Sequence, residues 1–236
     1  MALLLVPGYM LDETLWDELG AALAPFGPLS HADLRHDSTL ESMARRALEA
    51  APPSFVLVGF SMGGYVAREM VRQAPERVRA LVLIATSTRP DSPALRQSKG
   101  TVAKAAPSVS FAGLSRTAIA SSLHPRERDN AALIERVRMM GMRLGGAAFR
   151  RQSMLERPGD LHLLGRIACP TLVVAAGHDR LRSLAEAQEL HAGIPGAEFA
   201  LIEDSGHMIP LEAPQALLDV MLPWLARVAP LPHPET

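Results

Sequence analysis

The sequence predicts an α/β protein: a parallel sheet of about six strands, flanked by helices on both faces and interrupted by one all-helical insertion. Two observations predict this class. Continuous apolar runs of strand length recur along the chain, and stretches with the apolar spacing of a helix separate them. Strands buried on both faces carry uninterrupted apolar runs, and strands that alternate with helices are typical of a parallel sheet.

Length and composition agree with one globular domain. The chain has 236 residues, of which 48% are hydrophobic and 21% charged, enough for one sizeable core. Its 24 basic and 25 acidic residues lack the basic excess of a nucleic-acid or anionic-membrane binder. Cys169 is the only cysteine, which excludes an internal disulfide, a thiolate metal site and a redox pair. The first apolar run breaks at Pro7-Gly8, too early for a signal peptide or a membrane span. We therefore expect a cytoplasmic location.

The strands and helices follow one another in a regular order. Four apolar runs are strong and two are weaker: Leu3–Val6, Ser54–Gly59, Ala80–Ala85 and Thr171–Ala176, then Leu29–Leu34 and Glu198–Ile202. Helical spacing covers five stretches between them: Thr14–Leu23, Leu40–Ala50, Val66–Ala74, Leu184–His191 and Ala216–Val228. This alternation implies a parallel sheet covered by helices on both sides.

The alternation stops after Ala85 and resumes at Pro170. Three helices are predicted in between, over Ser92–Lys104, Phe111–Ser122 and Glu127–Leu144, the last ended by Gly145-Gly146. Helical insertions in such sheets usually lie over the carboxyl ends of the strands, where ligands bind. We therefore expect residues 90–157 to form a lid on a core of residues 1–89 and 158–236. The lid has 12 Lys or Arg and five Asp or Glu. A solvated Arg-rich surface is the simpler interpretation, and a preference for an anionic substrate is the alternative.

A G-x-S-x-G motif directly follows the second strong apolar run. In Gly59-Phe60-Ser61-Met62-Gly63-Gly64 the motif stands between a predicted buried strand and a helical pattern that runs to Ala74. Its glycines leave room for a tight, strained turn that lifts the Ser61 hydroxyl clear of the sheet edge. An incidental serine in a glycine-rich connection is the alternative, but the strand-turn-helix setting is the context that the motif requires. Ser61 is therefore the predicted nucleophile.

A serine hydroxyl is a weak nucleophile, so it needs a base, and the base needs an orienting carboxylate. His207 is the predicted base, because it alone among the eight histidines lies on a small-residue loop just after the last predicted strand. Asp179 follows the strand ending at Ala176 and is the predicted carboxylate, with a helix N-cap as the structural alternative. Asp91 is the fallback carboxylate, and His178 is a rival beside Asp179.

The remaining part of such a site is an oxyanion hole. The backbone N–H of Met62, directly after the nucleophile, is one expected donor. The N–H of Tyr9, on the loop after the first strand, is the other, since Pro7 has no N–H of its own. We expect the side chains of Met10 and Phe60 to line the substrate pocket. Lid residues around 111–123 and 137–144 should add to it, although most lid methionines are more simply explained as contacts with the sheet.

With these motifs, the chain resembles the α/β-hydrolase superfamily over nearly its whole length. The resemblance rests on Val-Pro-Gly-Tyr-Met with Trp16, Gly-Phe-Ser-Met-Gly-Gly, Ala-Pro-Glu-Arg-Val-Arg-Ala-Leu-Val-Leu-Ile-Ala-Thr, Cys-Pro-Thr-Leu-Val-Val-Ala-Ala-Gly-His-Asp and Ser-Gly-His-Met-Ile-Pro-Leu-Glu-Ala-Pro. The order Ser61, Asp179, His207 is also that of the fold. Within the superfamily the chain is similar to the small, helical-lidded carboxylesterases, a group that includes pimeloyl-ACP methyl ester esterase. Members of this group form an acyl-serine intermediate and need no cofactor.

The chain departs from the family pattern at two places. The family usually has His-Gly before the oxyanion residue, and here the pair is Pro7-Gly8. Because the expected donor is a backbone N–H, we expect this change to adjust the loop and to leave the oxyanion hole in place. The family also usually begins with two further strands, so the sheet here should have six strands, all parallel. Its exposed edge is then a candidate contact for a second copy of the chain. Serine at position 61 argues against the dehalogenase and epoxide-hydrolase chemistries, which need a nucleophilic aspartate.

The sequence therefore predicts a serine hydrolase of small carboxylic esters, with no metal and no cofactor. One alternative keeps the three catalytic residues, as a related proton-abstracting enzyme of menaquinone synthesis does, but acts on an anionic metabolite as a lyase or a carbon–carbon bond hydrolase. Another is a catalytically weak ligand-binding protein on the hydrolase frame. Neither the physiological substrate, nor its acyl-chain preference, nor the oligomeric state follows from the residues.

Overall fold

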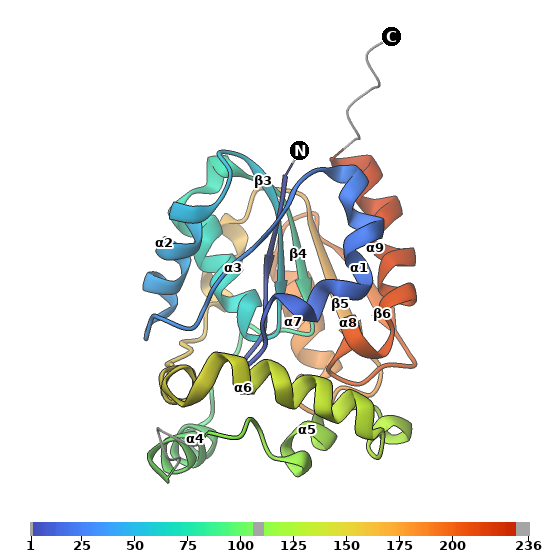
Figure 1. Ribbon diagram of the computed structural model, residues 1–236. Coiled ribbons are helices and arrows are strands. Elements are labelled where there is room, and N and C mark those ends of the chain that lie inside the picture. Colours follow the sequence, from blue (N-terminus) through green and yellow to red (C-terminus); the bar gives the residue numbers. More distant parts are fainter. Residues whose placement is uncertain (1, 106–110, 230–236) are drawn as a thin grey trace.

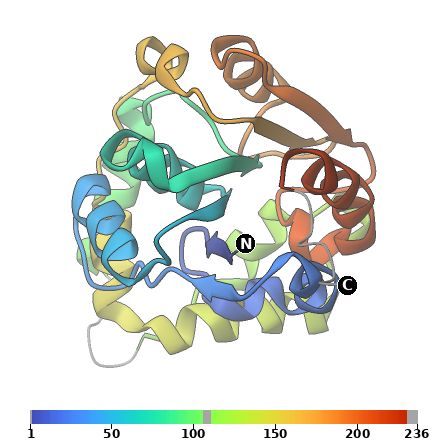
Figure 2. The same ribbon diagram turned by 90° about the horizontal axis from the view of Figure 1, so that it is seen from above.

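The computed structural model describes residues 2–105 and 111–229 and contains one six-stranded parallel sheet. The strand order across the sheet is β2-β1-β3-β4-β5-β6, seen end-on in Figure 2. The strands are β1 (Ala2–Val6), β2 (Leu29–His31), β3 (Phe55–Phe60), β4 (Val78–Ile84), β5 (Thr171–Ala176) and β6 (Glu198–Ile202). The predicted fold class is confirmed. Strand β2 is shorter than expected: it ends at His31 and not at Leu34.

Helices cover both faces of the sheet, and the crossover connections between parallel strands place them there (Figure 1). Helices α1 (Asp17–Leu23), α8 (Ile209–Glu212) and α9 (Pro214–Val228) pack on one face, and α2 (Leu40–Ala50), α3 (Met62–Gln73) and α7 (Leu184–Gly193) on the other. Short 3-10 helices complete these connections at Glu13–Trp16, Ala24–Phe26, Pro75–Arg77 and Leu161–Arg166.

The continuous apolar runs of the strands supply two separate cores. Side chains alternate between the faces of a strand. In β1, Leu3 and Leu5 belong to the core under α1 and α9, whereas Leu4 and Val6 belong to the core under α2, α3 and α7. All four are at most 2% exposed. Burial on both faces is the reason that these strands show no alternation of apolar and polar residues.

The chain order places a topological switch point between β1 and β3. After β1 the chain adds β2 on one side, and then crosses to the other side for β3 and all later strands. Crossover helices on opposite faces leave a crevice at the carboxyl ends of the two central strands, and ligands bind there in open α/β sheets. The loops after β1 and β3 carry Tyr9 and Ser61 to this crevice.

The insertion between β4 and β5 lies across the carboxyl ends of the strands (Figure 1). It contains α4 (Pro93–Ala105), α5 (Arg116–Ser122), the 3-10 turn Pro125–Glu127 and α6 (Ala131–Ser153). Three expected boundaries are wrong, among them the start of the third helix, which is Ala131 and not Glu127 because Asn130 caps it. α5 begins at Arg116 and not Phe111, because Ser115 caps it by accepting the Ala118 N–H. α6 continues past the glycine pair, since only Gly145 leaves helical geometry, at φ 81°, and the helix then resumes.

No helix within the described ranges combines the length and the apolar character that a membrane span requires.

Candidate active site

Ser61 occupies a strained turn between β3 and α3. Its φ is +51° and its ψ is −113°, a conformation that a non-glycine residue rarely adopts. The turn is held from both sides, because the Ser61 N–H donates to the Ile84 carbonyl at 2.9 Å and the Thr86 hydroxyl donates to the Ser61 carbonyl at 2.7 Å. A Cβ on Gly63 would lie 2.3 Å from the Val6 carbonyl oxygen. Only glycine at 63 therefore lets the first turn of α3 pack against the end of β1.

A chain of hydrogen bonds joins Ser61, His207 and Asp179. His207 Nε2 lies 2.8 Å from Ser61 Oγ, and His207 Nδ1 lies 2.7 Å from Asp179 Oδ2. Since a carboxylate only accepts, Nδ1 carries the proton that it donates to Asp179, and Nε2 is then free to accept the serine proton. The side chains of His207 and Asp179 are 5% and 2% exposed. The structure thus brings together the three residues that the sequence singles out.

The loop after β6 holds His207 by its backbone. The His207 N–H donates to the Ser122 carbonyl at 2.8 Å, which ties this loop to α5. The half-buried Glu212 carboxylate accepts the N–H groups of His124 and Met208 at 2.6 and 2.9 Å. Burial raises the pKa of Glu212, against the opposing effect of these backbone donors and of His207. Sequence analysis missed Glu212, whose only signal is its place five residues after the histidine.

Ser183 is the N-cap of α7, so Asp179 does not fill the helix-capping role that the sequence left open. Asp179 Oδ1 accepts the N–H groups of Leu181 and Arg182, at 2.7 and 2.9 Å, in an Asx turn, while Oδ2 faces His207. The fallback carboxylate Asp91 lies elsewhere, bonded to Lys99. The rival His178 stacks edge-on against His124, with ring centroids 4.3 Å apart.

A buried glutamine holds the loop after β1. The Met10 N–H donates to Gln152 Oε1 at 2.8 Å, and Gln152 Nε2 donates to the Leu34 carbonyl at 3.1 Å. This bond commits the Met10 N–H, and Pro7 has none, so Gly8 and Tyr9 are the N–H donors left in the turn. Met62 opens α3, where the first-turn N–H groups have no intrahelical partner. Nothing in the sequence pattern indicated Gln152.

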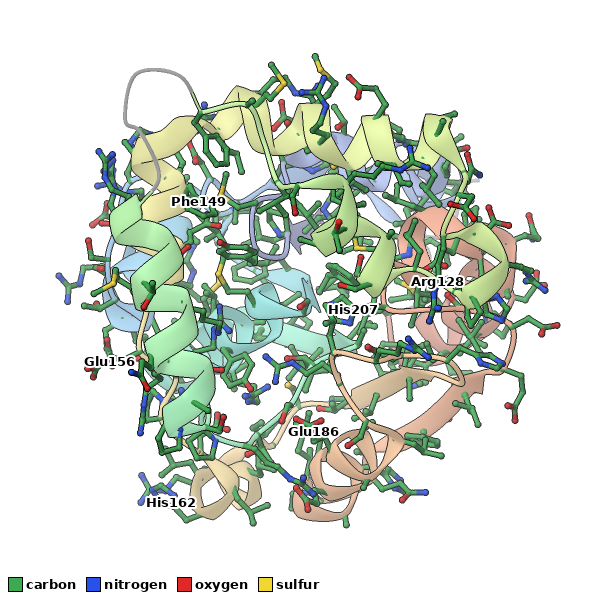
Figure 3. All side chains as sticks on the ribbon, turned by 90° about the horizontal axis from the view of Figure 1, so that it is seen from below. Arg128, Phe149, Glu156, His162, Glu186 and His207 are labelled. Atoms are coloured by element: carbon green, nitrogen blue, oxygen red, sulfur yellow. The ribbon has the colours of Figure 1, made fainter. Side chains whose placement is uncertain are left out.

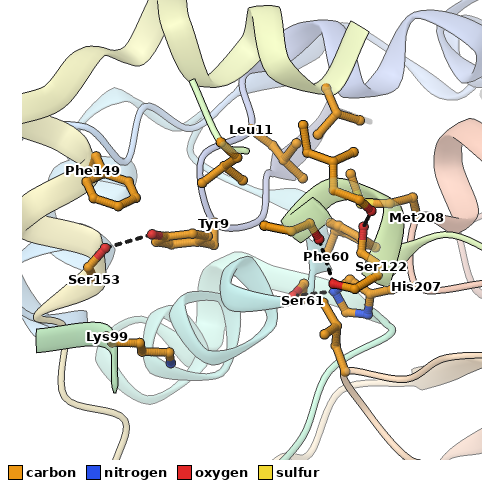
Figure 4. Close-up of a pocket in the computed structure, with 16 residues that line it drawn as sticks. Tyr9, Leu11, Phe60, Ser61, Lys99, Ser122, Phe149, Ser153, His207 and Met208 are labelled. Atoms are coloured by element: carbon orange, nitrogen blue, oxygen red, sulfur yellow. Dashed lines mark hydrogen bonds between the residues drawn. The ribbon is translucent and has the colours of Figure 1, made fainter. Parts of the chain in front are cut away.

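A cavity of about 380 Å³ opens above Ser61, between the sheet edge and the insertion (Figure 4). Most of its lining is apolar: Leu11, Phe60, Leu114, Ala118, Ile119, Val137, Phe149, Leu181 and Met208; the polar residues are Tyr9, Ser61, Lys99, Ser121, Ser122, Ser153 and His207. Phe60 therefore lines the cavity as expected, and Met10 does not. Met139 and Met142 are about one-third exposed, and Met140 is buried in the core.

The insertion contributes both walls and polar groups to this cavity. Viewed from the side of the insertion, His207 lies near the middle of the molecule, with Phe149 of α6 and the loop of Arg128 on either side (Figure 3). Among the described arginines of the insertion, none lines the cavity. Several instead form surface ion pairs, such as Arg138 with Glu135 and Arg136 with Glu18. The cation in the cavity is Lys99, which the sequence did not single out.

Among the described residues, no group of three or more His, Cys, Asp or Glu side chains is arranged to hold a metal ion.

The chain is similar to known hydrolases in sequence and in fold. Residues 3–220 match the model of the alpha/beta hydrolase family. A pimeloyl-[acyl-carrier protein] methyl ester esterase of Klebsiella pneumoniae is 40% identical over 93 residues, a stretch that covers only 36% of each chain. The equivalent enzyme of Aromatoleum aromaticum is 28% identical over 90% of this chain and 93% of its own. A thermophilic esterase from Thermogutta terrifontis, solved with malate bound, has 30% identity and a TM-score of 0.86, covering 97% of this chain and 90% of its own. By sequence and by structure, the chain belongs to the alpha/beta hydrolase family.

Proposed function

We propose that this chain is a serine esterase that cleaves small carboxylic esters through an acyl-serine intermediate. One observation carries the proposal: Ser61 and His207 line a largely apolar cavity, bonded to each other, and His207 is bonded in turn to Asp179. The three side chains have the geometry of a nucleophile, its general base and the group that orients the base. The esterases that resemble the chain, named above, support the same reaction class.

In the proposed acylation, Ser61 Oγ attacks the ester carbonyl carbon while its proton passes to His207 Nε2. The carbonyl oxygen becomes an oxyanion, which the N–H groups of Tyr9 and Met62 stabilise. The carbon–oxygen bond to the alcohol then breaks, and His207 returns the proton to the leaving oxygen. Asp179 keeps the imidazole oriented and stabilises its positive charge during both transfers.

In the proposed deacylation, a water molecule attacks the acyl-serine carbonyl and gives its proton to His207. The second tetrahedral intermediate uses the same N–H donors. Its collapse releases the carboxylic acid and returns the proton to Ser61, so the cycle needs no cofactor. Residues 90–157 act as a lid in this proposal, since α5 and α6 supply cavity walls over the reacting atoms.

The test is hydrolysis of p-nitrophenyl esters from acetate to long acyl chains by the wild type and by Ser61→Ala. We expect turnover by the wild type and a loss of at least about 10³-fold in kcat for Ser61→Ala, since removing a triad member leaves only residual catalysis. Ser54→Ala, an exposed serine just before β3, is the matched control. A fluorophosphonate should label the wild type at Ser61 and leave Ser61→Ala unlabelled.

Two results would overturn the proposal. Turnover by Ser61→Ala close to that of the wild type would remove the nucleophile. A single stoichiometric release of p-nitrophenol, with no turnover on any ester, would favour a ligand-binding protein on the hydrolase frame.

A further inference from the structure

One end of the cavity carries a cationic side chain. Lys99 extends from α4 into the lining of the same cavity that holds Ser61. Its Nζ donates to Asp91 Oδ2 at 2.6 Å, and its side chain is 21% exposed. The charge of a lysine is costly to desolvate in a largely apolar ligand cavity. An anionic partner in the cavity would offset this cost.

The carboxylate of Asp91 does not fully neutralise Lys99, because Asp91 is also paired with a second cation. Arg157 Nη1 lies 3.5 Å from Asp91 Oδ1, and the Arg157 side chain is 5% exposed. The Arg157 Nε is buried without a hydrogen-bond partner. Two cations therefore face one carboxylate, and the nearby Arg182 is already paired with Glu186 at 3.5 Å. Counted over the residues that the structure describes, the cluster retains one positive charge without a paired carboxylate.

The electrostatics of Lys99 agree with this count. Burial and the charge of Arg157 lower the pKa of Lys99 to about 8, although Asp91 acts in the opposite direction. At neutral pH the ammonium group is still protonated, and an anion beside it would relieve the repulsion from Arg157. The excess positive charge therefore lies at Lys99, which a ligand in the cavity can reach.

Two hydroxyl groups lie at the same end of the cavity. The Tyr9 and Ser153 hydroxyls are 2.7 Å apart and both residues line the cavity. One O–H is used in the bond between them, which leaves the other able to donate to a ligand. In Figure 4, Lys99, Ser153 and the Tyr9 hydroxyl all lie on the side of Ser61 opposite to His207 and Met208.

This arrangement separates the two parts of an ester. His207 must protonate the leaving oxygen, so the alcohol part lies on the histidine side of Ser61 and the acyl part extends away from it. We propose that Lys99, Tyr9 and Ser153 form an anion subsite, which binds a carboxylate at the far end of the acyl chain. The inference rests on the proposed esterase function and names its substrate class: monoesters of dicarboxylic acids.

The experiment compares substrates that differ only in this carboxylate. Monomethyl esters of dicarboxylic acids from succinic to suberic are set against methyl esters of monocarboxylic acids of equal chain length. The acetate ester of γ-hydroxybutyric acid, set against butyl acetate, places the carboxylate on the alcohol part. We expect the wild type to have a higher kcat/KM for the dicarboxylic monoester than for its neutral counterpart at an optimal length. A preference for the neutral ester at every length, or for the carboxylate on the alcohol part, would overturn the proposal.

Variants of Lys99 test the subsite directly. Lys99→Met should lower the ratio of kcat/KM for the anionic ester to that for the neutral ester by about 10- to 100-fold, the value of one hydrogen bond to a charged group. Lys99→Arg should restore part of that ratio, because it keeps the charge. Arg96→Met, an exposed residue of the same helix, is the control. An equal loss on both esters would show a structural role and contradict the proposal.

A binding measurement separates this inference from the esterase proposal. Ser61→Ala protein is titrated with adipate by calorimetry, alone and combined with Lys99→Met. If adipate binds Ser61→Ala and its affinity is at least tenfold weaker in the double variant, the subsite is supported even if no ester is hydrolysed. Absence of adipate binding, together with Ser61-dependent hydrolysis of neutral esters, would overturn the subsite alone.

Discussion

The two carboxylate oxygens of Asp179 serve different purposes. Oδ1 closes the turn after β5 by accepting two backbone N–H groups, and Oδ2 accepts from His207 Nδ1. Asp179 therefore closes the turn before α7 and bonds to the histidine at the same time, while Ser183 caps the helix. The turn fixes the carboxylate so that its second oxygen is already aimed at the histidine before substrate arrives.

Asp179→Asn separates the two purposes. The amide oxygen can still close the turn, but the amide nitrogen would face His207 Nδ1 and favour the wrong tautomer. We expect kcat on p-nitrophenyl esters to fall by about 10³- to 10⁴-fold with the melting temperature nearly unchanged. Asp204→Asn, an exposed residue of the histidine loop, is the control. A loss of less than tenfold in kcat would argue against a role for Asp179 in orienting His207.

At the scale of elements, helix α6 holds the loop after β1 in place. Gln152 near its end bonds to Met10 and Leu34, and Arg143 forms a bidentate pair with Asp12 at 2.6 and 3.1 Å. Met10 adopts a φ of +55°, which a methionine does not adopt without such restraint. One helix of the insertion thus holds the backbone that is proposed to bind the oxyanion.

Gln152→Leu removes this restraint at nearly constant volume. The Met10 N–H would lose its acceptor, and the loop would shift relative to the reacting carbonyl. Since small misplacements in an active site cost up to about 10²-fold in rate, we expect kcat to fall by about 10- to 100-fold with a smaller change in KM. Affinity for a trifluoromethyl ketone, which mimics the tetrahedral intermediate, should fall in parallel with kcat/KM. Unchanged ketone affinity in folded protein would contradict this positioning role; Gln215→Leu, on the surface of α9, is the control.

At the scale of the whole molecule, a buried ion cluster joins the insertion to the core. Asp160 bonds to Arg68 of α3 at 2.8 Å and to the Thr88 hydroxyl at 2.7 Å, and its N–H donates to the Thr88 carbonyl. Arg68 is fully buried. The chain therefore leaves the core near Thr88 and returns to it near Asp160, at adjacent points. Arg68 of α3, the helix that follows Ser61, holds the two points together. This closure is what lets a long segment be inserted without disturbing the sheet.

Asp160→Asn should lower the free energy of unfolding by about 3–5 kcal/mol, because it leaves the Arg68 charge buried without its partner. Burial alone would raise the pKa of Asp160, but Arg68, Thr88 and Arg72 outweigh it and lower that pKa. A carboxyl with a lowered folded-state pKa stabilises the protein above its unfolded pKa, near 3.9, and loses this contribution as the pH falls through the folded-state pKa.

Urea unfolding from neutral to acid pH measures this effect. The wild type should lose stability below about pH 4, and Asp160→Asn should lose less over the same range. Asp33→Asn breaks a half-exposed pair with Arg35 and should cost at most about 1 kcal/mol. Equal unfolding free energies of Asp160→Asn and the wild type at neutral pH would contradict the prediction.

Much of the fold, and the order of the three bonded residues, could be predicted because short-range constraints encode them. A strand buried on both faces must be apolar throughout, and the turn at Ser61 admits only small neighbours, so both leave marks in contiguous sequence. Boundaries in the insertion were wrong because the signals for them, Ser115 and Asn130 as caps and Gly145 as a single kink, are weak where glycine and polar residues are frequent.

By itself, therefore, the sequence determined the six-stranded parallel sheet, the helices between its strands, and the placement of Ser61, Asp179 and His207 at strand ends that meet at one edge. Only the tertiary structure decided that Gln152 holds Met10, which lies 142 residues away, and that Lys99 enters the cavity while the arginines of the insertion do not. The physical reason is that these contacts depend on the direction in which α4 and α6 cross the sheet. That direction is set by packing between distant segments and leaves no periodic or local pattern in the chain.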